Sequence, residues 1–313
     1  MRKGLKRILF TIITLFVLLN IIAAFHAYKF THFYSDVEAV KPPEKMGFGS
    51  KLSSVLFGIK FPKSKIKELP NSKYENVVIK TSDGLNLKGW YLQADSYSKG
   101  TVIMFHGHGS SRSGIITNAE FIKSLGWNIL LLDTRAHGES DGNVCTIGVE
   151  EANDVKAAFE FVQFKNEKNI VLYGVSLGAS TILRAIKEFN IKPSKLIIEM
   201  PFGTLLDAIK GRMKLMHLPQ QPLSSLLAFW GGIEQGFWAF NHEPQEYAKS
   251  VFCPTLLQWG LHDPRVTQKE VETIYNNIPV KEKSYIIYNN SGHQNLYKSE
   301  PEKWSSSIKN FLQ

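Results

Sequence analysis

The sequence predicts an α/β fold: a mostly parallel central sheet with flanking helices and a helical cap, preceded by one N-terminal transmembrane helix. Two patterns predict it. Between residues 101 and 288, short runs of apolar residues alternate with helical stretches. Near the N-terminus, one long apolar run carries no charged side chain. Continuous apolar strands between helices are typical of a parallel sheet that is covered on both faces.

The N-terminal run extends from Ile8 to Tyr28 without a Lys, Arg, Asp or Glu. At about 1.5 Å per residue, a helix of this length spans a bilayer core of roughly 30 Å. We therefore expect residues 1–29 to be a signal-anchor that contacts the lipid bilayer through residues 8–28. A cleaved signal peptide is the alternative, but the run is long for one and small residues at a cleavage site are hard to place.

The basic residues that closely flank this run lie almost entirely before it. Only Lys29 follows it closely, whereas four precede it: Arg2, Lys3, Lys6 and Arg7. The positive-inside rule predicts a single-pass membrane protein whose main domain lies on the non-cytoplasmic side, periplasmic or extracellular.

The composition argues against nucleic-acid binding, a zinc site and a disulfide framework. The net charge is +9, but beyond the N-terminus the basic residues are scattered, so we expect no nucleic-acid binding. Cys145 and Cys253 lie far apart and form no C-x-x-C motif, which indicates neither a zinc site nor a disulfide framework.

The segment after the run has little regular pattern. Residues 30–70 carry four prolines and several glycines, and we interpret them as a linker and approach segment. The main domain, residues 71–313, begins with an alternating pattern on both sides of Asp83-Gly84, which is typical of a β-hairpin.

Six apolar runs then predict the strands of the sheet. They cover residues 101–105, 128–133, 169–173, 195–200, 254–259 and 284–288. Most of them lead into a polar or glycine-rich turn, and active sites of such sheets lie at the carboxyl ends of the strands.

Residues 203–250 interrupt the alternation of strands and helices. They are rich in aromatic residues: Phe229, Trp230, Phe237, Trp238 and Phe240. We interpret this segment as a mainly helical cap over the strand ends; ordinary core helices are the alternative.

Ser176 is the predicted nucleophile. It is the serine of Gly174-Val175-Ser176-Leu177-Gly178, which lies between an apolar strand and a helical run, the context that gives a G-x-S-x-G motif its meaning. The glycines leave room for a sharp turn that exposes the hydroxyl, and the start of the helix favours developing negative charge.

A serine hydroxyl needs a base, and the base needs an orienting carboxylate. His293 follows the last strand in a tight Ser-Gly-His turn, and we expect it to be the base. Asp263 follows the strand at 254–259 and is the expected acid; a helix N-cap is its structural alternative. Glu199, which ends the preceding strand, is the second candidate for the acid.

Two backbone N–H groups should stabilise the oxyanion of the reaction. One is that of Leu177, the residue after the nucleophile. The other is that of His108, because Gly107 before it permits a tight loop after the strand at 101–105.

We expect the other polar residues near the strand ends to have structural roles and not to bind a metal. His106, His108, His137 and Asp133 match no zinc spacing, so the sequence predicts no metal and no cofactor. We expect His106 and His137 to shape their loops, and Asp133 and Arg135 to form a structural pair.

These motifs resemble those of the α/β-hydrolase superfamily, and within it the serine aminopeptidase-like and monoacylglycerol lipase-like groups. The resemblance covers roughly residues 74–313, and Ala136 departs from a glycine that many relatives have in the same loop. Its specific parts are the H-G-x motif at 105–108, the D-x-R-x-H-G-x-S segment at 133–140, the serine turn at 174–178, the G-x-x-D turn at 260–263 and Gly292-His293.

The resemblance implies esterase, thioesterase, lipase or peptidase chemistry. From the residues and the resemblance together we expect a membrane-anchored carboxylic ester hydrolase with a small acyl ester or lipid-like substrate. An aminopeptidase-like enzyme or a thioesterase on the same triad, a metal-dependent hydrolase and a catalytically silent binding protein on this fold are the alternatives. The sequence indicates no protein partner.

Overall fold

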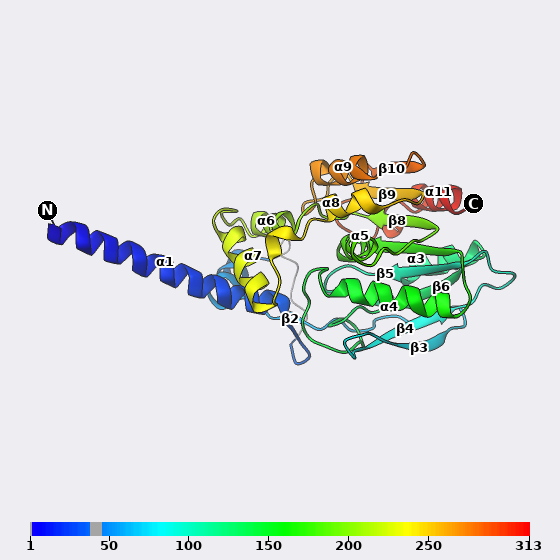
Figure 1. The fold of residues 1–313 in the computed structure, drawn as a ribbon, viewed down its shortest axis with the longest axis horizontal. Coiled ribbons are helices and arrows are strands. Elements are labelled where there is room, and N and C mark those ends of the chain that lie inside the picture. Colours follow the sequence, from blue (N-terminus) through cyan, green and yellow to red (C-terminus); the bar gives the residue numbers. More distant parts are fainter. Residues whose placement is uncertain (1, 38–45) are drawn as a thin grey trace.

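A computed structural model describes residues 2–37 and 46–313. Residues 38–45, which belong to the expected linker and include Pro42 and Pro43, lie outside the described residues. The chain has two visibly different parts: a long N-terminal helix that projects outward, and an α/β body that holds the C-terminus at its far end (Figure 1).

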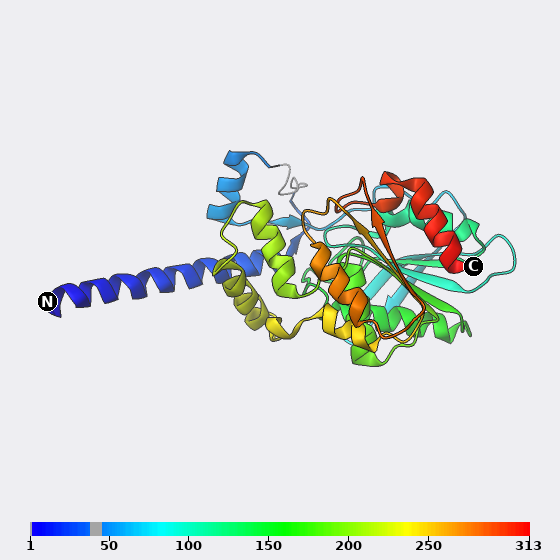
Figure 2. The same ribbon diagram turned by 90° about the horizontal axis from the view of Figure 1, so that it is seen from above.

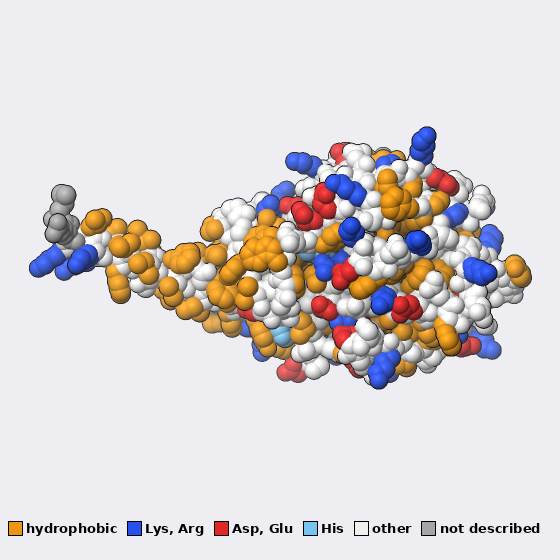
Figure 3. Space-filling view, in the orientation of Figure 1, with side chains coloured by type: hydrophobic (Ala, Val, Ile, Leu, Met, Phe, Trp, Pro, Cys, Tyr) orange, Lys and Arg blue, Asp and Glu red, His pale blue; other side chains and the backbone are white. Residues whose placement is uncertain are grey.

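The N-terminal helix α1 covers Arg2–Thr31. Among the described residues it is the one helix long and apolar enough to cross a membrane, and its apolar window is largely exposed. Its surface is almost entirely hydrophobic, with basic side chains gathered at the tip (Figure 3). The expected apolar helix is therefore present.

An eight-stranded sheet forms the centre of the body, in the order β10-β9-β8-β7-β5-β6-β4-β3. The hairpin strands β3 and β4 run antiparallel to each other, and β4 is antiparallel to β6; all other pairs are parallel. The strands are β3 (Glu75–Lys80), β4 (Asn86–Leu92), β5 (Thr101–Phe105), β6 (Asn128–Leu132), β7 (Ile170–Val175), β8 (Lys195–Glu199), β9 (Thr255–Gly260) and β10 (Lys283–Tyr288). The predicted hairpin and all six predicted strands thus lie where the sequence placed them.

Helices cover both faces of this sheet. One group consists of α4 and α5, which contact each other, and the other of α3 and α11, which also contact each other. Figure 2 shows the two groups on opposite sides of the strands. The body helices are α3 (Ile116–Ser124), α4 (Glu151–Phe164), α5 (Leu177–Phe189), α9 (Gln268–Asn277), α10 (Leu296–Ser299) and α11 (Pro301–Leu312).

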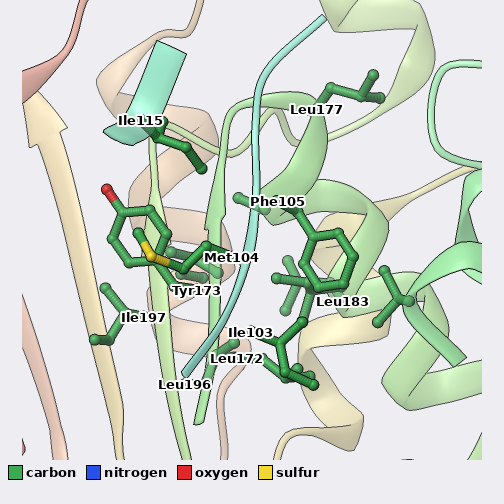
Figure 4. Close-up of a cluster of buried hydrophobic side chains, with 14 of the residues drawn as sticks. Ile103, Met104, Phe105, Ile115, Leu172, Tyr173, Leu177, Leu183, Leu196 and Ile197 are labelled. Carbon is green, nitrogen blue, oxygen red and sulfur yellow. The ribbon is translucent and has the colours of Figure 1, made fainter. Parts of the chain in front are cut away.

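The core lies where the central strands meet these helices. Every residue of β5 is buried, as its uninterrupted apolar sequence predicts. Figure 4 shows Met104 of β5 beside Tyr173 of β7, and Phe105 pointing to the other side, toward Leu183 of α5. The serine turn between β7 and α5 therefore lies between a buried strand and a helix that packs on the core.

The segment expected as a cap contains α6 (Leu205–Leu215), α7 (Leu223–Glu234) and α8 (Pro244–Tyr247). Helix α7 lies along the C-terminal part of α1, in both views of the fold. In contrast, α8 packs against α5 and α9 on the flank of the body.

The segment between α1 and the hairpin is attached to the body. It forms β1 (Phe33–Tyr34), α2 (Phe48–Phe57) and β2 (Phe61–Pro62), and β1 pairs with β2. Phe33 is buried, and the Ser64 hydroxyl accepts a hydrogen bond from the N–H of Gly138 at 2.9 Å.

Candidate active site

Ser176 lies in the tight turn between β7 and α5, with φ 51° and ψ −110°. A positive φ is uncommon for a residue that has a Cβ, and it is typical of a nucleophile elbow. The turn needs glycine nearby, because a Cβ at Gly178 would lie 2.5 Å from the carbonyl oxygen of Phe105. The backbone therefore holds the serine at the carboxyl end of β7.

The structure brings His293 and Asp263 to this serine. The Nε2 atom of His293 lies 3.0 Å from Oγ of Ser176, and its Nδ1 atom lies 2.7 Å from Oδ2 of Asp263. An ionised carboxylate can only accept, so Nδ1 carries the proton and donates it. Nε2 is then the acceptor for the serine hydroxyl.

Asp263 is held by its own loop. Its Oδ1 atom accepts hydrogen bonds from the N–H groups of Arg265 and Val266 at 2.8 and 2.9 Å. The side chain is buried, which leaves Oδ2 directed at His293. The N-cap of the next helix is Thr267, so Asp263 does not have the capping role that was its structural alternative.

The loop that carries His293 closes tightly over the end of β9. A Cβ at Gly260 would lie 2.6 Å from the carbonyl oxygens of both Ser291 and Gly292, so only glycine leaves room for the loop. The hydroxyl of Ser291 donates to Glu300 at 2.7 Å and fixes the loop from the other side.

Glu199, the second candidate for the acid, points elsewhere. Its carboxyl accepts hydrogen bonds from Trp304 Nε1 at 2.6 Å and Gln258 Nε2 at 3.1 Å. Burial raises its pKa to about 7, against the effect of the hydrogen bond from Trp304. Its side chain therefore belongs to a buried polar cluster beneath the site.

The two N–H groups expected to bind the oxyanion flank the serine. Leu177 begins α5, directly after Ser176. The loop of His108 approaches from β5, since a Cβ at Gly107 would lie 3.6 Å from the Cβ of Ser176. Within residues 2–37 and 46–313, neither the Leu177 nor the His108 N–H has an acceptor, so both are available to a ligand.

His106 and His137 shape the loops around the site. His106 Nε2 accepts from the N–H of Thr134 at 3.3 Å, and His137 Nε2 accepts from the N–H of Gly109 at 3.1 Å. Burial lowers the pKa of both imidazoles, that of His137 to about 3, with nearby His106 as a further cause for His137. Both rings are therefore neutral acceptors that tie the strand-end loops together.

The expectation that Asp133 and Arg135 form a pair with each other is wrong. Asp133 pairs with Arg112, which comes from the loop after β5 and also donates its backbone N–H to Oδ1 at 2.6 Å. Arg135 instead donates to Asp154, on α4, and to Asp83, in the hairpin turn. The two residues therefore anchor different neighbouring elements.

A cavity of about 580 Å³ lies beside the loop after β5, with His108 and Gly109 among its lining residues. The rest of the lining is mainly apolar and comes largely from α1, α6 and α7, with Lys67, Arg212 and Arg265 as its charged residues. Phe237 lines it, but the other four aromatic residues singled out in the cap do not. Trp230 donates to Asn20 of α1 at 3.0 Å, and Trp238 is 52% exposed.

Comparisons with known proteins agree with this fold. The family model "Serine aminopeptidase, S33" matches residues 96–227. The Pyrococcus furiosus esterase Pf2001 has a structure that superposes with a TM-score of 0.66 at 27% identity, covering 80% of this chain and 97% of the esterase.

Proteins with similar sequences were also found. A Bacillus subtilis protein, YqkD, is 24% identical over 75% of this chain and 78% of its own length. The lysophosphatidylserine lipase ABHD12 of Xenopus tropicalis is 23% identical, over 64% of this chain and 52% of the lipase.

A serine in a tight turn between a strand and a helix, on a mostly parallel sheet, is typical of one class of hydrolases. The proteins found in the comparisons belong to the same class. The chain is a member of the α/β-hydrolase superfamily, similar to esterases and lipases.

Proposed function

We propose that this protein is a membrane-anchored serine hydrolase that cleaves carboxylic esters through an acyl-enzyme on Ser176. One observation carries the proposal: Asp263, His293 and Ser176 form an unbroken chain of hydrogen bonds at 2.7 and 3.0 Å. Such a chain activates a serine hydroxyl, which is a weak nucleophile on its own.

In the first half of the reaction, His293 Nε2 takes the proton of the Ser176 hydroxyl as Oγ attacks the ester carbonyl. The carbonyl oxygen becomes an oxyanion, which the N–H groups of Leu177 and His108 stabilise. The tetrahedral intermediate collapses, the bond to the alcohol oxygen breaks, and His293 returns the proton to the leaving alcohol. An acyl group remains on Ser176.

In the second half, His293 takes a proton from water as the water attacks the acyl carbonyl. The second tetrahedral intermediate collapses, the bond to Oγ breaks, and the proton returns to Ser176. A carboxylic acid leaves. Asp263 keeps its charge throughout and stabilises the imidazolium of His293.

The cavity favours an acyl substrate over a peptide. An aminopeptidase holds a positively charged amino terminus, for which an acidic side chain is the natural partner. Among the described residues that line the cavity there is no Asp or Glu. The resemblance to esterases and to a lipase supports the same choice.

Helix α1 supports the membrane anchor. Its apolar length suits a bilayer core, and basic side chains at its tip suit the cytoplasmic side, which would place the body outside the cytoplasm. Fusing an alkaline phosphatase or a fluorescent reporter to the C-terminus tests the orientation, because the former works only after export. A reporter active only in the cytoplasm would contradict it.

Labelling with a fluorophosphonate tests the nucleophile. The probe reacts with a serine made nucleophilic by a neighbouring base, so we expect wild type to be modified at Ser176 and Ser176→Ala to be inert. His293→Ala should lose nearly as much activity on a p-nitrophenyl ester, because triad members act as a unit. If folded wild type resists the probe between about pH 6 and 9, the proposal fails and a binding function takes its place.

A further inference from the structure

We propose that the C-terminal turns of helix α1 form one wall of a binding site for a long acyl chain, so that the membrane helix itself holds part of the substrate. This inference rests on the ester-hydrolase function proposed above and names its substrate class: an ester of a single long acyl chain, taken from the bilayer in which α1 lies.

The C-terminal part of α1 packs closely against α7. Ala23 and Ala27 of α1 are only 4% and 3% exposed, although most of the helix is exposed. A Cβ at Gly231 of α7 would lie 3.8 Å from that of Ala27, which shows how closely the two helices approach. At the C-terminal end of α1, Gln235 donates to the Thr31 hydroxyl at 3.3 Å. The last turns of α1 are therefore packed as part of the body.

The same turns face the cavity. Leu19, Ile22, Ala23, Ala27 and Phe30 of α1 line it, opposite residues of α6 and α7. A volume of about 580 Å³ lies within the roughly 300–1,000 Å³ of small-molecule sites, and the lining, mainly apolar with Lys67, Arg212 and Arg265 as its charged residues, suits a hydrocarbon chain that ends in a polar ester group. No other element in the described part of the chain is both a wall of this cavity and a candidate membrane span.

The cavity also borders the proposed oxyanion loop, since His108 and Gly109 line it. The ring of His108 is stacked on Phe30 with 5.9 Å between centroids, and it also contacts Phe33 and Phe61. Burial, followed by the charge of Arg212, lowers the pKa of His108 well below its ordinary value, so the imidazole is neutral although Arg212 and Arg265 also line the cavity. Because His108 lines the cavity, a chain that reaches this residue would bring its ester group beside the N–H of His108.

On the α1 side, the cavity borders the surface that lipid would cover. Ile22 lines the cavity and is also 51% exposed on the helix. An acyl chain can therefore pass from lipid to cavity along α1 without entering water. Exposing the chain to water would lower the equilibrium constant for this transfer roughly fourfold for each methylene group.

Two pairs of variants, the second a matched control for the first, test whether α1 and α7 line the site for the acyl chain. Ile22→Trp and Leu227→Trp narrow the cavity, whereas Ile21→Trp and Leu226→Trp place the same ring on a neighbouring residue of the same helix that does not line it. The readout is the ratio of kcat/KM for a dodecanoyl to a butanoyl p-nitrophenyl ester, in detergent micelles. We expect the first pair to lower this ratio at least about tenfold and the second pair to leave it within about twofold. Equal ratios in all four variants would overturn the proposal.

A binding experiment separates this proposal from the catalytic one. In the full-length Ser176→Ala protein, a fluorescent hexadecanoic acid analogue should bind, and adding Ile22→Trp should weaken binding about tenfold while adding Ile21→Trp should not. If the analogue binds in this way but wild type hydrolyses no ester, the catalytic proposal fails and the cavity stands. If wild type hydrolyses short esters but the analogue does not bind, or Ile22→Trp binds as tightly as Ile21→Trp, the cavity proposal is wrong.

Discussion

His137 and Gly109 join two strand-end loops: Nε2 of the buried imidazole accepts the backbone N–H of Gly109 at 3.1 Å. The other ring nitrogen, Nδ1, lies 2.8 Å from the carbonyl oxygen of Arg135, to which it donates. Gly109 directly follows His108, whose N–H is a proposed oxyanion donor. His137 is therefore a positioning residue for that donor.

Replacing His137 should lower turnover without greatly changing substrate binding. Without the imidazole, the N–H of Gly109 loses its acceptor and the loop can shift, which weakens stabilisation of the transition state. We expect His137→Ala to reduce kcat on a short ester at least about tenfold, less than the loss of a whole oxyanion donor, with KM nearly constant. His217→Ala, at an exposed histidine, is the control. An unchanged kcat in folded His137→Ala would rule out this role.

The two candidate acids should respond oppositely to neutralisation. Asp263→Asn should keep the fold but lower kcat by about four powers of ten, because the amide favours the wrong tautomer of His293. Glu199→Gln should keep activity within about twofold, since the Glu199 carboxyl accepts hydrogen bonds from Trp304 and Gln258 and does not contact His293. Steady-state kinetics at pH 8 measures both. An inactive but folded Glu199→Gln enzyme would reverse the assignment.

A single methyl group at Gly260 should displace the catalytic histidine. Its Cβ would lie 2.6 Å from the backbone oxygens of Ser291 and Gly292, so the His293 loop would have to move. We expect Gly260→Ala to lose at least about a hundredfold in kcat and fluorophosphonate labelling rate. Gly49→Ala, where a Cβ meets nothing within 4 Å, should match wild type. Normal labelling of Gly260→Ala would show that the loop tolerates the shift.

His242 should make stability depend on pH. Its buried imidazole donates from Nε2 to the carbonyl oxygen of Ile147 at 3.0 Å, and burial, followed by the charge of Arg184, lowers its pKa to about 3. Below about pH 6.5 the unfolded chain gains a proton at this residue while the folded chain does not until about pH 3, so the free energy of unfolding falls as the pH falls through that window.

The variant His242→Gln removes this dependence. Any stability deficit that it shows at pH 7.5 should therefore shrink by about 2 kcal/mol at pH 5, at about 1.4 kcal/mol per pH unit below 6.5. Denaturant unfolding of both proteins at the two pH values measures the difference, in which the contributions of other titrating groups largely cancel. A deficit that does not change with pH would show that His242 titrates alike in the folded and unfolded chains.

Local patterns predicted much of this structure. The strands from β5 to β10 are continuous apolar runs, and the serine turn is defined by glycines that the close packing of β7, α5 and β5 requires. The positions of Ser176, Asp263 and His293 after successive strands also follow from local sequence. Parallel strands bring their carboxyl ends together, so these side chains could be expected to meet.

Contacts between distant segments could not be predicted in the same way. Asp133 pairs with Arg112 rather than Arg135 because the loops after β5 and β6 meet in space, and no periodicity encodes that meeting. The same holds for the packing of Phe33 and Phe61 around His108. The aromatic residues of the expected cap are visible in the sequence, but which of them lines the cavity depends on how α7 and the turn after it, which carries Phe237, pack in the fold.

The close packing of α1 on α7 bears on how this protein can be prepared. A chain shortened to begin after the apolar run would lose Ala23 and Ala27, and with them the cover of the α7 surface around Ala228 and Gly231. An uncovered apolar patch of this kind promotes self-association or recruits detergent. The shortened chain would then differ from the whole protein in aggregation state and in the lining of the cavity, so its poor behaviour in solution would say little about the full-length protein.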